Sequence, residues 1–184
     1  MTARTVSRLD GYDLAEHAHV FALWAAARAI QRRAKGAKSK GLSKAFASAG
    51  LRAEFQAADQ SQWDAVSFDA EHKGWCERFQ RSAAPAFVLS FGQAAKFIAI
   101  YLKVVLVLRV PQSSFGKCVH PPIDGELLKA VPEAHLAAVG LDHSSAWTKF
   151  DFESYSAAIA ALRAWMPDLE EFWRIEAFWN PVNA

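Results

Sequence analysis

The chain has 184 residues, of which 52% are hydrophobic and 22% charged, with a formal net charge of +2. That length indicates one domain of ordinary size with its own apolar core. The two cysteines, Cys76 and Cys118, exclude a disulfide framework, and no Cys/His spacing typical of zinc occurs. The apolar run 97–102 ends at Lys103 and is far too short to cross a membrane. The N-terminal MTARTVSRLDGYD lacks the apolar core of a signal peptide, so we expect a soluble cytoplasmic protein.

Apolar residues recur at helical spacing along the chain, and no strand-like alternation persists. We expect a first helix over 13–34, then a Gly/Lys/Ser loop that leads into a short helix over 43–48. The later segments predict helices over 68–80, 90–108, 125–131, 132–140, 151–165 and 168–179, with a loop at 109–117. The sequence therefore predicts an all-α protein that forms a single compact multi-helix domain over 1–184.

Two of these helices start behind residues that typically cap a helix. Ser67 is placed to cap the helix over 68–80, and Asp124 the helix over 125–131. Pro121 and Pro122 force an extended approach to Asp124. We interpret His120, directly before the prolines, as a turn residue or the partner of a backbone carbonyl.

Positive charge is concentrated in one segment, because no acidic residue occurs between Glu16 and Glu54. Such a basic surface suits contact with phosphate groups. When the segment is taken alone, a solvated helix end and loop is the simpler interpretation. The segment 28–52 holds eight positive residues: Arg28, Arg32, Arg33, Lys35, Lys38, Lys40, Lys44 and Arg52.

The apolar helix over 90–108 carries two lysines, Lys96 and Lys103, almost two helical turns apart and so close to one stripe. A single lysine on a buried helix extends its ammonium group to solvent, but so narrow a polar stripe indicates a cleft. Desolvation and the positive end of the helix are expected to lower the pKa of Lys96 there. A neutral amine attacks carbon centres and forms Schiff bases, which makes Lys96 the candidate nucleophile. Lys103 is then a structural or phosphate-binding residue.

The segment GQAAKFIAIYLK…HPPID resembles the catalytic segment of helix-hairpin-helix DNA glycosylases, especially the archaeal 8-oxoguanine glycosylase branch. That branch has a lysine that opens an apolar helix, a second lysine seven residues later, and a proline-rich element that ends in aspartate. Lys96, Lys103 and Asp124 match these positions, and Gly92 matches a glycine four residues before the first lysine. The resemblance covers about 91–128 and is thinner over 147–179.

The resemblance implies an activity and a partner. A damaged base is flipped out of double-stranded DNA, Lys96 attacks the sugar and displaces the base, and Asp124 stabilises the cationic sugar. The resulting imine can lead to strand cleavage, and the implied role is base-excision repair of an oxidised purine such as 8-oxoguanine. No metal or organic cofactor is required. A DNA-binding protein of this kind would associate with the nucleoid of a bacterial-type cell.

The resemblance also suggests residues that contact the substrate. Gln93 is placed either to read a base edge or to sit at an exposed helix start. The family often has an aromatic residue four positions after the lysine, where this chain has Ile100, so stacking would fall to Tyr101, Trp173 or Trp179. Phosphate contacts to the two flanks of the lesion are expected from Arg28, Arg32, Arg33, Lys35, Lys38 and Lys40.

Each of these assignments has a plainer alternative. Asp124 is by default a helix cap, the C-terminal aromatic residues suit core packing, and Trp147 is interpreted as structural. The chain as a whole is alternatively a non-catalytic helical module that binds nucleic acid. A third possibility is a helical protein-interaction adaptor, in which the two lysines only solvate one edge.

Overall fold

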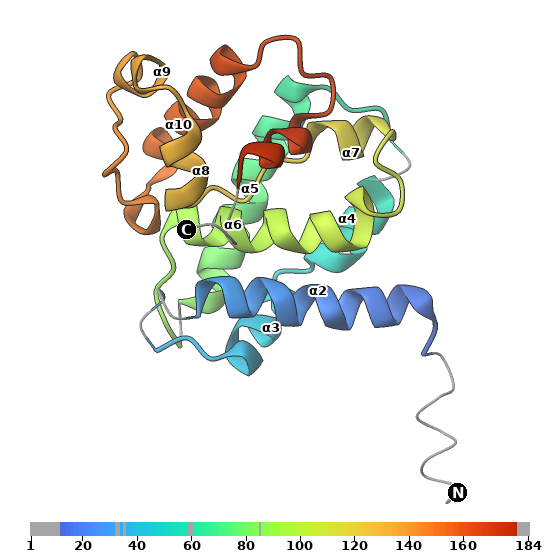
Figure 1. The fold of residues 1–184 in the computed structure, drawn as a ribbon. Coiled ribbons are helices and arrows are strands. Elements are labelled where there is room, and N and C mark those ends of the chain that lie inside the picture. The colour runs from blue at the N-terminus through green and yellow to red at the C-terminus, as the bar shows by residue number, and fades with distance from the viewer. Residues whose placement is uncertain (1–11, 32–33, 35, 59–60, 85, 180–184) are drawn as a thin grey trace, which may run out of the picture.

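A computed structural model describes residues 12–31, 34, 36–58, 61–84 and 86–179. Within these ranges every regular element is helical and none is a strand, which confirms the predicted all-α class. The helices form one compact body (Figure 1). In chain order they are α2 (Leu14–Ile30), α3 (Ser39–Ser48), α4 (Leu51–Ala58), α5 (Ala65–Ala83), α6 (Phe91–Leu102), the π-helical turn η1 (Lys103–Val107), α7 (Ser114–Cys118), α8 (Gly125–Ala130), α9 (Glu133–Ala137), the 3-10 turn η2 (Trp147–Lys149), α10 (Phe152–Trp165) and the 3-10 segment η3 (Phe172–Phe178).

Helix α6 occupies the centre of the molecule, with α2 along one side and α8 and η3 on the other (Figure 1). Its first nine residues, 91–99, are all buried. The aromatic core on the α2 side joins Phe46 of α3 to Phe97 and Tyr101 of α6, with ring centroids 5.5 and 4.4 Å apart. This burial explains why the segment is apolar on almost every face and why any polar side chain on it needs a partner.

Helix α6 begins at a capping box. The Ser90 hydroxyl accepts a hydrogen bond from the Gln93 N–H at 3.1 Å, and the Gln93 side-chain oxygen accepts one from the Ser90 N–H at 3.0 Å. Both bonds satisfy backbone donors that a helix start leaves without partners. The cap fixes the start of α6 and thereby the position of Lys96 in its second turn.

The structure corrects several predicted helix limits. Helix α2 ends at Ile30, before the predicted limit at 34, and α3 starts four residues before the predicted position 43. Helices α4 and α7 lie in segments for which no helix was predicted. The cap of α5 is Asp64 and not Ser67, whose N–H and hydroxyl instead bond back to Asp64 in a capping box. Short helices such as α4 and α7 depend on tertiary packing, so their local sequences give weak signals.

The C-terminal segment also departs from the prediction. A helix was expected from Asp168, but the chain forms the 3-10 segment η3 only from Phe172. Its N-cap residue Glu171 accepts hydrogen bonds from two side chains, that of Gln112 outside the segment at 2.5 Å and that of Arg174 within it at 3.1 Å. Side-chain contacts of this kind are not visible in local periodicity. No helix in the described part of the chain combines the length and the apolarity needed to cross a membrane.

Gly92 in the first turn of α6 marks the closest approach between two segments. Its N–H donates to the Phe150 carbonyl at 3.0 Å, and a Cβ there would lie 2.2 Å from the Trp147 carbonyl oxygen.

We expect Gly92→Ala to lower the free energy of unfolding by about 1–3 kcal/mol, because the backbone of η2 must move. Gly74→Ala in α5 is the matched control: nothing lies within 4 Å of its Cβ, so alanine should stabilise that helix by about 0.5–1 kcal/mol. Urea unfolding of both variants measures the difference, and equal effects would contradict the close approach.

Candidate functional site

Lys96 and Asp124 meet where α6 faces α8. The Nζ of Lys96 lies 2.9 Å from Oδ2 of Asp124, although 28 positions separate them in the chain. The two side chains are only 10% and 14% exposed, so the pair is mostly shielded from water. A carboxylate at this distance holds the amine in one place and is positioned to accept its proton.

The two carboxylate oxygens of Asp124 have different partners. Oδ1 accepts from the backbone N–H groups of Glu126 and Leu127 at 3.0 Å each, which confirms Asp124 as the N-cap of α8. Oδ2 accepts from Lys96 and, at 3.1 Å, from the indole N–H of Trp179. Capping therefore uses one oxygen and leaves the other facing the lysine, so the two roles predicted for Asp124 are compatible.

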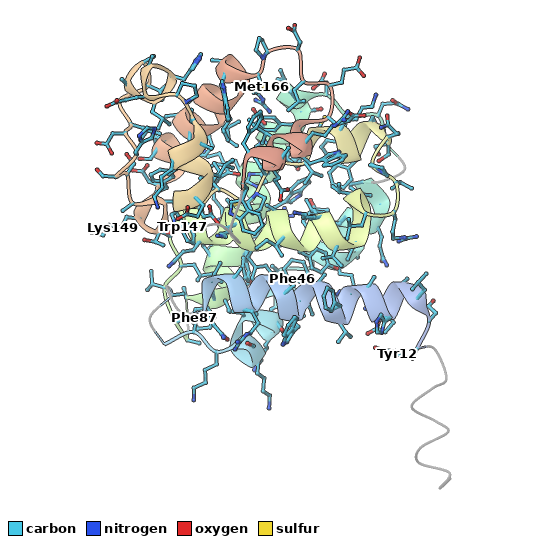
Figure 2. All side chains as sticks on the ribbon, in the orientation of Figure 1. Tyr12, Phe46, Phe87, Trp147, Lys149 and Met166 are labelled. Atoms are coloured by element: carbon cyan, nitrogen blue, oxygen red, sulfur yellow. The ribbon has the colours of Figure 1, made fainter. Side chains whose placement is uncertain are left out.

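Two tryptophans flank the pair. Trp147 lies beside the first turns of α6 (Figure 2), and the Lys96 ammonium is 4.5 Å from the centroid of its ring. A cation over an indole face gains electrostatic attraction, more so where water is excluded. This contact was not expected from the interpretation of Trp147 as structural. No local sequence motif predicts this contact, because η2 and α6 are brought together only by tertiary packing. Trp179, at the end of η3, was predicted as a substrate contact and lies against Asp124.

The second lysine has an acidic partner of its own. Lys103 opens the π-helical turn η1 and forms an ion pair with Glu176 of η3. Burial raises the pKa of Glu176, the Lys103 ammonium opposes that shift, and the negative charge of Asp124 adds to it. Glu176 was not predicted as a site residue, since an acid among C-terminal aromatic residues carries no recognisable motif. Short π turns in helices are often found at functional sites. We call Lys96, Lys103, Asp124, Trp147, Glu176 and Trp179 the Lys96 cluster.

Three other predicted substrate contacts lie elsewhere or have other partners. Gln93 is buried and not at an exposed helix start, because its side chain belongs to the capping box of α6. Tyr101 faces the α2 side, where its hydroxyl is 2.8 Å from Nδ1 of His19 and burial raises its pKa. Trp173 is half-buried in η3, and its buried indole N–H has no hydrogen-bond partner within the described residues. The structure thus does not bring Tyr101 to the Lys96 cluster.

The described part of the basic segment lies mainly on the α2–α3 side of α6, opposite η3 (Figure 1). Arg28, Lys38 and Lys40 are exposed there, whereas Arg52 pairs with Glu16 at 2.7 Å. Arg32, Arg33 and Lys35 lie outside the described residues. The described basic residues and the Lys96 cluster therefore occupy different faces, and a duplex that touches both would have to extend around the molecule.

A second polar cluster lies between α5 and α10, where the side chains of His120 and Tyr155 are buried and those of Asp69 and Arg163 are partly exposed. Arg163 donates two hydrogen bonds to the Asp69 carboxylate, at 2.6 and 2.8 Å. The ring nitrogens of His120 lie 2.8 Å from Asp69 and 3.1 Å from the Tyr155 hydroxyl. His120 was interpreted as a turn residue or the partner of a backbone carbonyl; it does lie in the non-helical stretch between α7 and α8, but its partners are side chains. Burial would raise the pKa of Asp69, but the bonds from Arg163 and His120 hold it well below its usual range.

Two buried histidines make this cluster sensitive to acid. Burial lowers the pKa of His72 and of His120 below the ordinary value of 6.5, and Asp69 opposes the shift at both. As the pH falls below 6.5, the unfolded chain binds protons at these rings while the folded chain does not. These two rings should therefore lower the free energy of unfolding by up to about 2.7 kcal/mol per pH unit, or about 1.4 for each histidine. Urea unfolding between pH 7.5 and 5.5 measures the slope. His72→Phe should remove about half of this contribution, and a flat profile would contradict neutral buried imidazoles.

Within the described residues no group of three His, Cys, Asp or Glu side chains is arranged to hold a metal ion. Comparison of the chain with protein-family models, with curated proteins and with solved structures finds no match.

Proposed function

We propose that the chain is a DNA glycosylase of the helix-hairpin-helix type, with associated lyase activity, that excises an oxidised purine such as 8-oxoguanine from double-stranded DNA. The observation that supports this most is the 2.9 Å distance between Lys96 Nζ and Asp124 Oδ2 in a mostly buried, aromatic-lined position. A stabilising ion pair alone does not need such a position, because burying two charges is costly even when they are paired. The resemblance of the surrounding segments to this family supports the same activity.

In the proposed reaction, Asp124 Oδ2 first takes a proton from the Lys96 ammonium. The neutral amine attacks C1′ of the flipped nucleotide, the glycosidic bond breaks, and the base leaves with the bonding electrons. The proton held by Asp124 passes to the departing base. A second amine proton then passes to the ring oxygen O4′ as the C1′–O4′ bond breaks, which opens the sugar ring and leaves an imine between Lys96 and C1′. Removal of a proton at C2′ then expels the 3′ phosphate and cleaves the strand.

The other members of the Lys96 cluster support this assignment. The ammonium of Lys96 lies over Trp147, and the indole N–H of Trp179 fixes the Asp124 oxygen that faces the lysine. Flat aromatic side chains beside a nucleophile suit a flipped base, which other enzymes hold between aromatic or apolar groups. Lys103 and Glu176 together add no net charge at the edge of the cluster.

The direct test is base release. A duplex with one 8-oxoguanine and a matched duplex with guanine are incubated with the protein, and free base and cleaved strand are quantified separately. We expect release from the 8-oxoguanine duplex only, followed by cleavage. A folded protein that binds both duplexes and releases neither 8-oxoguanine nor another oxidised base would contradict the proposal.

That negative outcome would favour a non-catalytic nucleic-acid-binding module. The observation that supports this second candidate is that Arg28, Lys38 and Lys40 are exposed and form no ion pairs with other described residues. Binding should then weaken steeply with salt. An R28Q/K38Q/K40Q variant should show a shallower salt dependence, by about 0.9 in the logarithmic slope for each phosphate group that it no longer binds. If the protein binds no DNA even at low salt, the result would favour the third possibility, a protein-interaction adaptor.

A further inference from the structure

A cavity of about 280 Å³ lies between α5 and α10, and the Asp69–His120–Tyr155 network forms part of its wall. It shares no residue with the Lys96 cluster. Phe152, Tyr155 and Ile159 supply much of its apolar wall. Ligand sites in proteins are typically concave and apolar with a few convergent polar groups, at volumes of roughly 300–1,000 Å³ for drug-sized molecules. The cavity has that composition at the small end of the range, so it suits a ligand of about one ring.

The charges that line the cavity do not cancel. The Asp69 carboxylate is compensated by the two hydrogen bonds from Arg163. Burial lowers the pKa of both lining histidines, His72 and His120, below the ordinary value, which favours neutral imidazoles that add no charge. Lys73 forms no ion pair with any described residue, and its ammonium lies 4.1 Å from the centroid of the Phe152 ring. One positive charge therefore remains uncompensated at a half-enclosed site, which favours an anionic ligand.

The hydrogen-bonding capacity of the network is mostly used within the protein. In neutral His120 the N–H at Nε2 donates to Asp69, which leaves Nδ1 to accept from the Tyr155 hydroxyl. These groups hold the wall rigid but offer little to an incoming ligand. Donors that the network does not use include the ammonium of Lys73 and the hydroxyl of Ser156, and both residues line the cavity. Both suit the oxygens of one carboxylate.

Aromatic side chains define the shape of the space. The rings of His72 and Tyr155 stack, with an interplanar angle of 15° and centroids 5.4 Å apart, and Phe152 forms another part of the wall. A planar ring packs on such surfaces in offset or edge-to-face geometry. We propose that this cavity is a binding site for a small aromatic carboxylate, whose carboxylate bonds Lys73 and whose ring packs against Phe152 and Ile159.

Benzoate is the probe, and the imidazole C–H signals of the histidines provide the readout in NMR titrations of the full chain. We expect the signals of His72 and His120, which line the cavity, to shift, while those of His135 and His143 on the α9 side stay in place. The dissociation constant should be on the order of 1 mM, as for a ligand of this size. No shift at concentrations that saturate such a site would overturn the proposal.

Three variants separate the site from adventitious binding. Lys73→Met keeps the apolar stem and should weaken benzoate about tenfold, because it removes one charge-assisted hydrogen bond. Benzyl alcohol, which lacks the charge, should bind wild type and Lys73→Met equally. Lys129→Met, at an exposed lysine of α8, is the matched control and should change nothing. Ser156→Phe should fill the cavity and abolish binding while the protein still unfolds cooperatively. Equal benzoate affinity in wild type and Lys73→Met would overturn the proposal even if Ser156→Phe failed to fold.

Discussion

Lys96→Met is expected to lower the rate of base release on the order of 10³-fold or more while the protein stays folded. The amine is the only nucleophile in the proposed reaction, and removal of a covalent nucleophile leaves only the contributions of binding and electrostatics. Methionine fills nearly the same volume, so the core around α6 should persist. Asp124 would keep its bonds to the start of α8 and to Trp179. Single-turnover base release on the 8-oxoguanine duplex measures the effect.

Lys103→Met is the matched control for that experiment, because Lys103 comes from the same helical stripe and also has a carboxylate partner. It should weaken substrate binding and keep the covalent chemistry. Wild-type turnover in folded Lys96→Met would refute the role of Lys96. If Lys103→Met instead abolished turnover, the enzyme class would stand and the nucleophile would be Lys103.

Asp124→Ala is expected to lower the free energy of unfolding by about 3–5 kcal/mol. The change removes the cap of α8, typically worth about 1 kcal/mol, and leaves the Lys96 ammonium buried without its carboxylate, which is the larger cost. Urea unfolding gives the magnitude.

Asp124→Asn should be less destabilising because its amide oxygen can still accept hydrogen bonds from the backbone N–H groups at the start of α8. It should nonetheless reduce base release by roughly 10²–10⁴-fold, because it no longer accepts a proton.

Asp151→Ala provides the comparison for a cap alone. Asp151 caps α10 through the Ser154 N–H at 2.8 Å, is exposed, and has no lysine partner among the described residues. Its removal should cost only about 1 kcal/mol. Lys96→Met introduced into Asp124→Ala should recover part of the stability, because no unpaired ammonium would remain. Equal costs for the two aspartates would contradict a strongly coupled, buried Lys96–Asp124 pair.

The parts of the site that follow local rules were predictable. Asp124 precedes a short amphipathic segment and follows two prolines, a pattern that places a carboxylate at a helix start. The seven-residue spacing of Lys96 and Lys103 puts both close to one stripe of the continuous helical segment formed by α6 and η1. The same geometry shows why Tyr101 is misplaced as a substrate contact: five residues of helix rotate it about 140° from Lys96, toward the α2 side where it bonds His19.

The parts that depend on tertiary packing were not predictable. Trp147 and Glu176 come from 3-10 segments that have no periodic pattern of their own, and only the fold carries them to α6 and η1. His120 looks like a turn residue in the sequence because its partners, Asp69 and Tyr155, lie 51 and 35 positions away. Gly92 is a comparable case. A side chain at this position is excluded only because the backbone of η2 packs against it.

Borohydride trapping tests the central claim most directly. The protein is incubated with the 8-oxoguanine duplex in the presence of borohydride, which reduces an imine to a stable secondary amine, and the crosslinked peptide is identified by mass spectrometry. The proposed mechanism predicts a covalent adduct at Lys96 that disappears in Lys96→Met and persists in Lys103→Met. An adduct at another residue, or base release without any adduct, would contradict a Lys96 Schiff base.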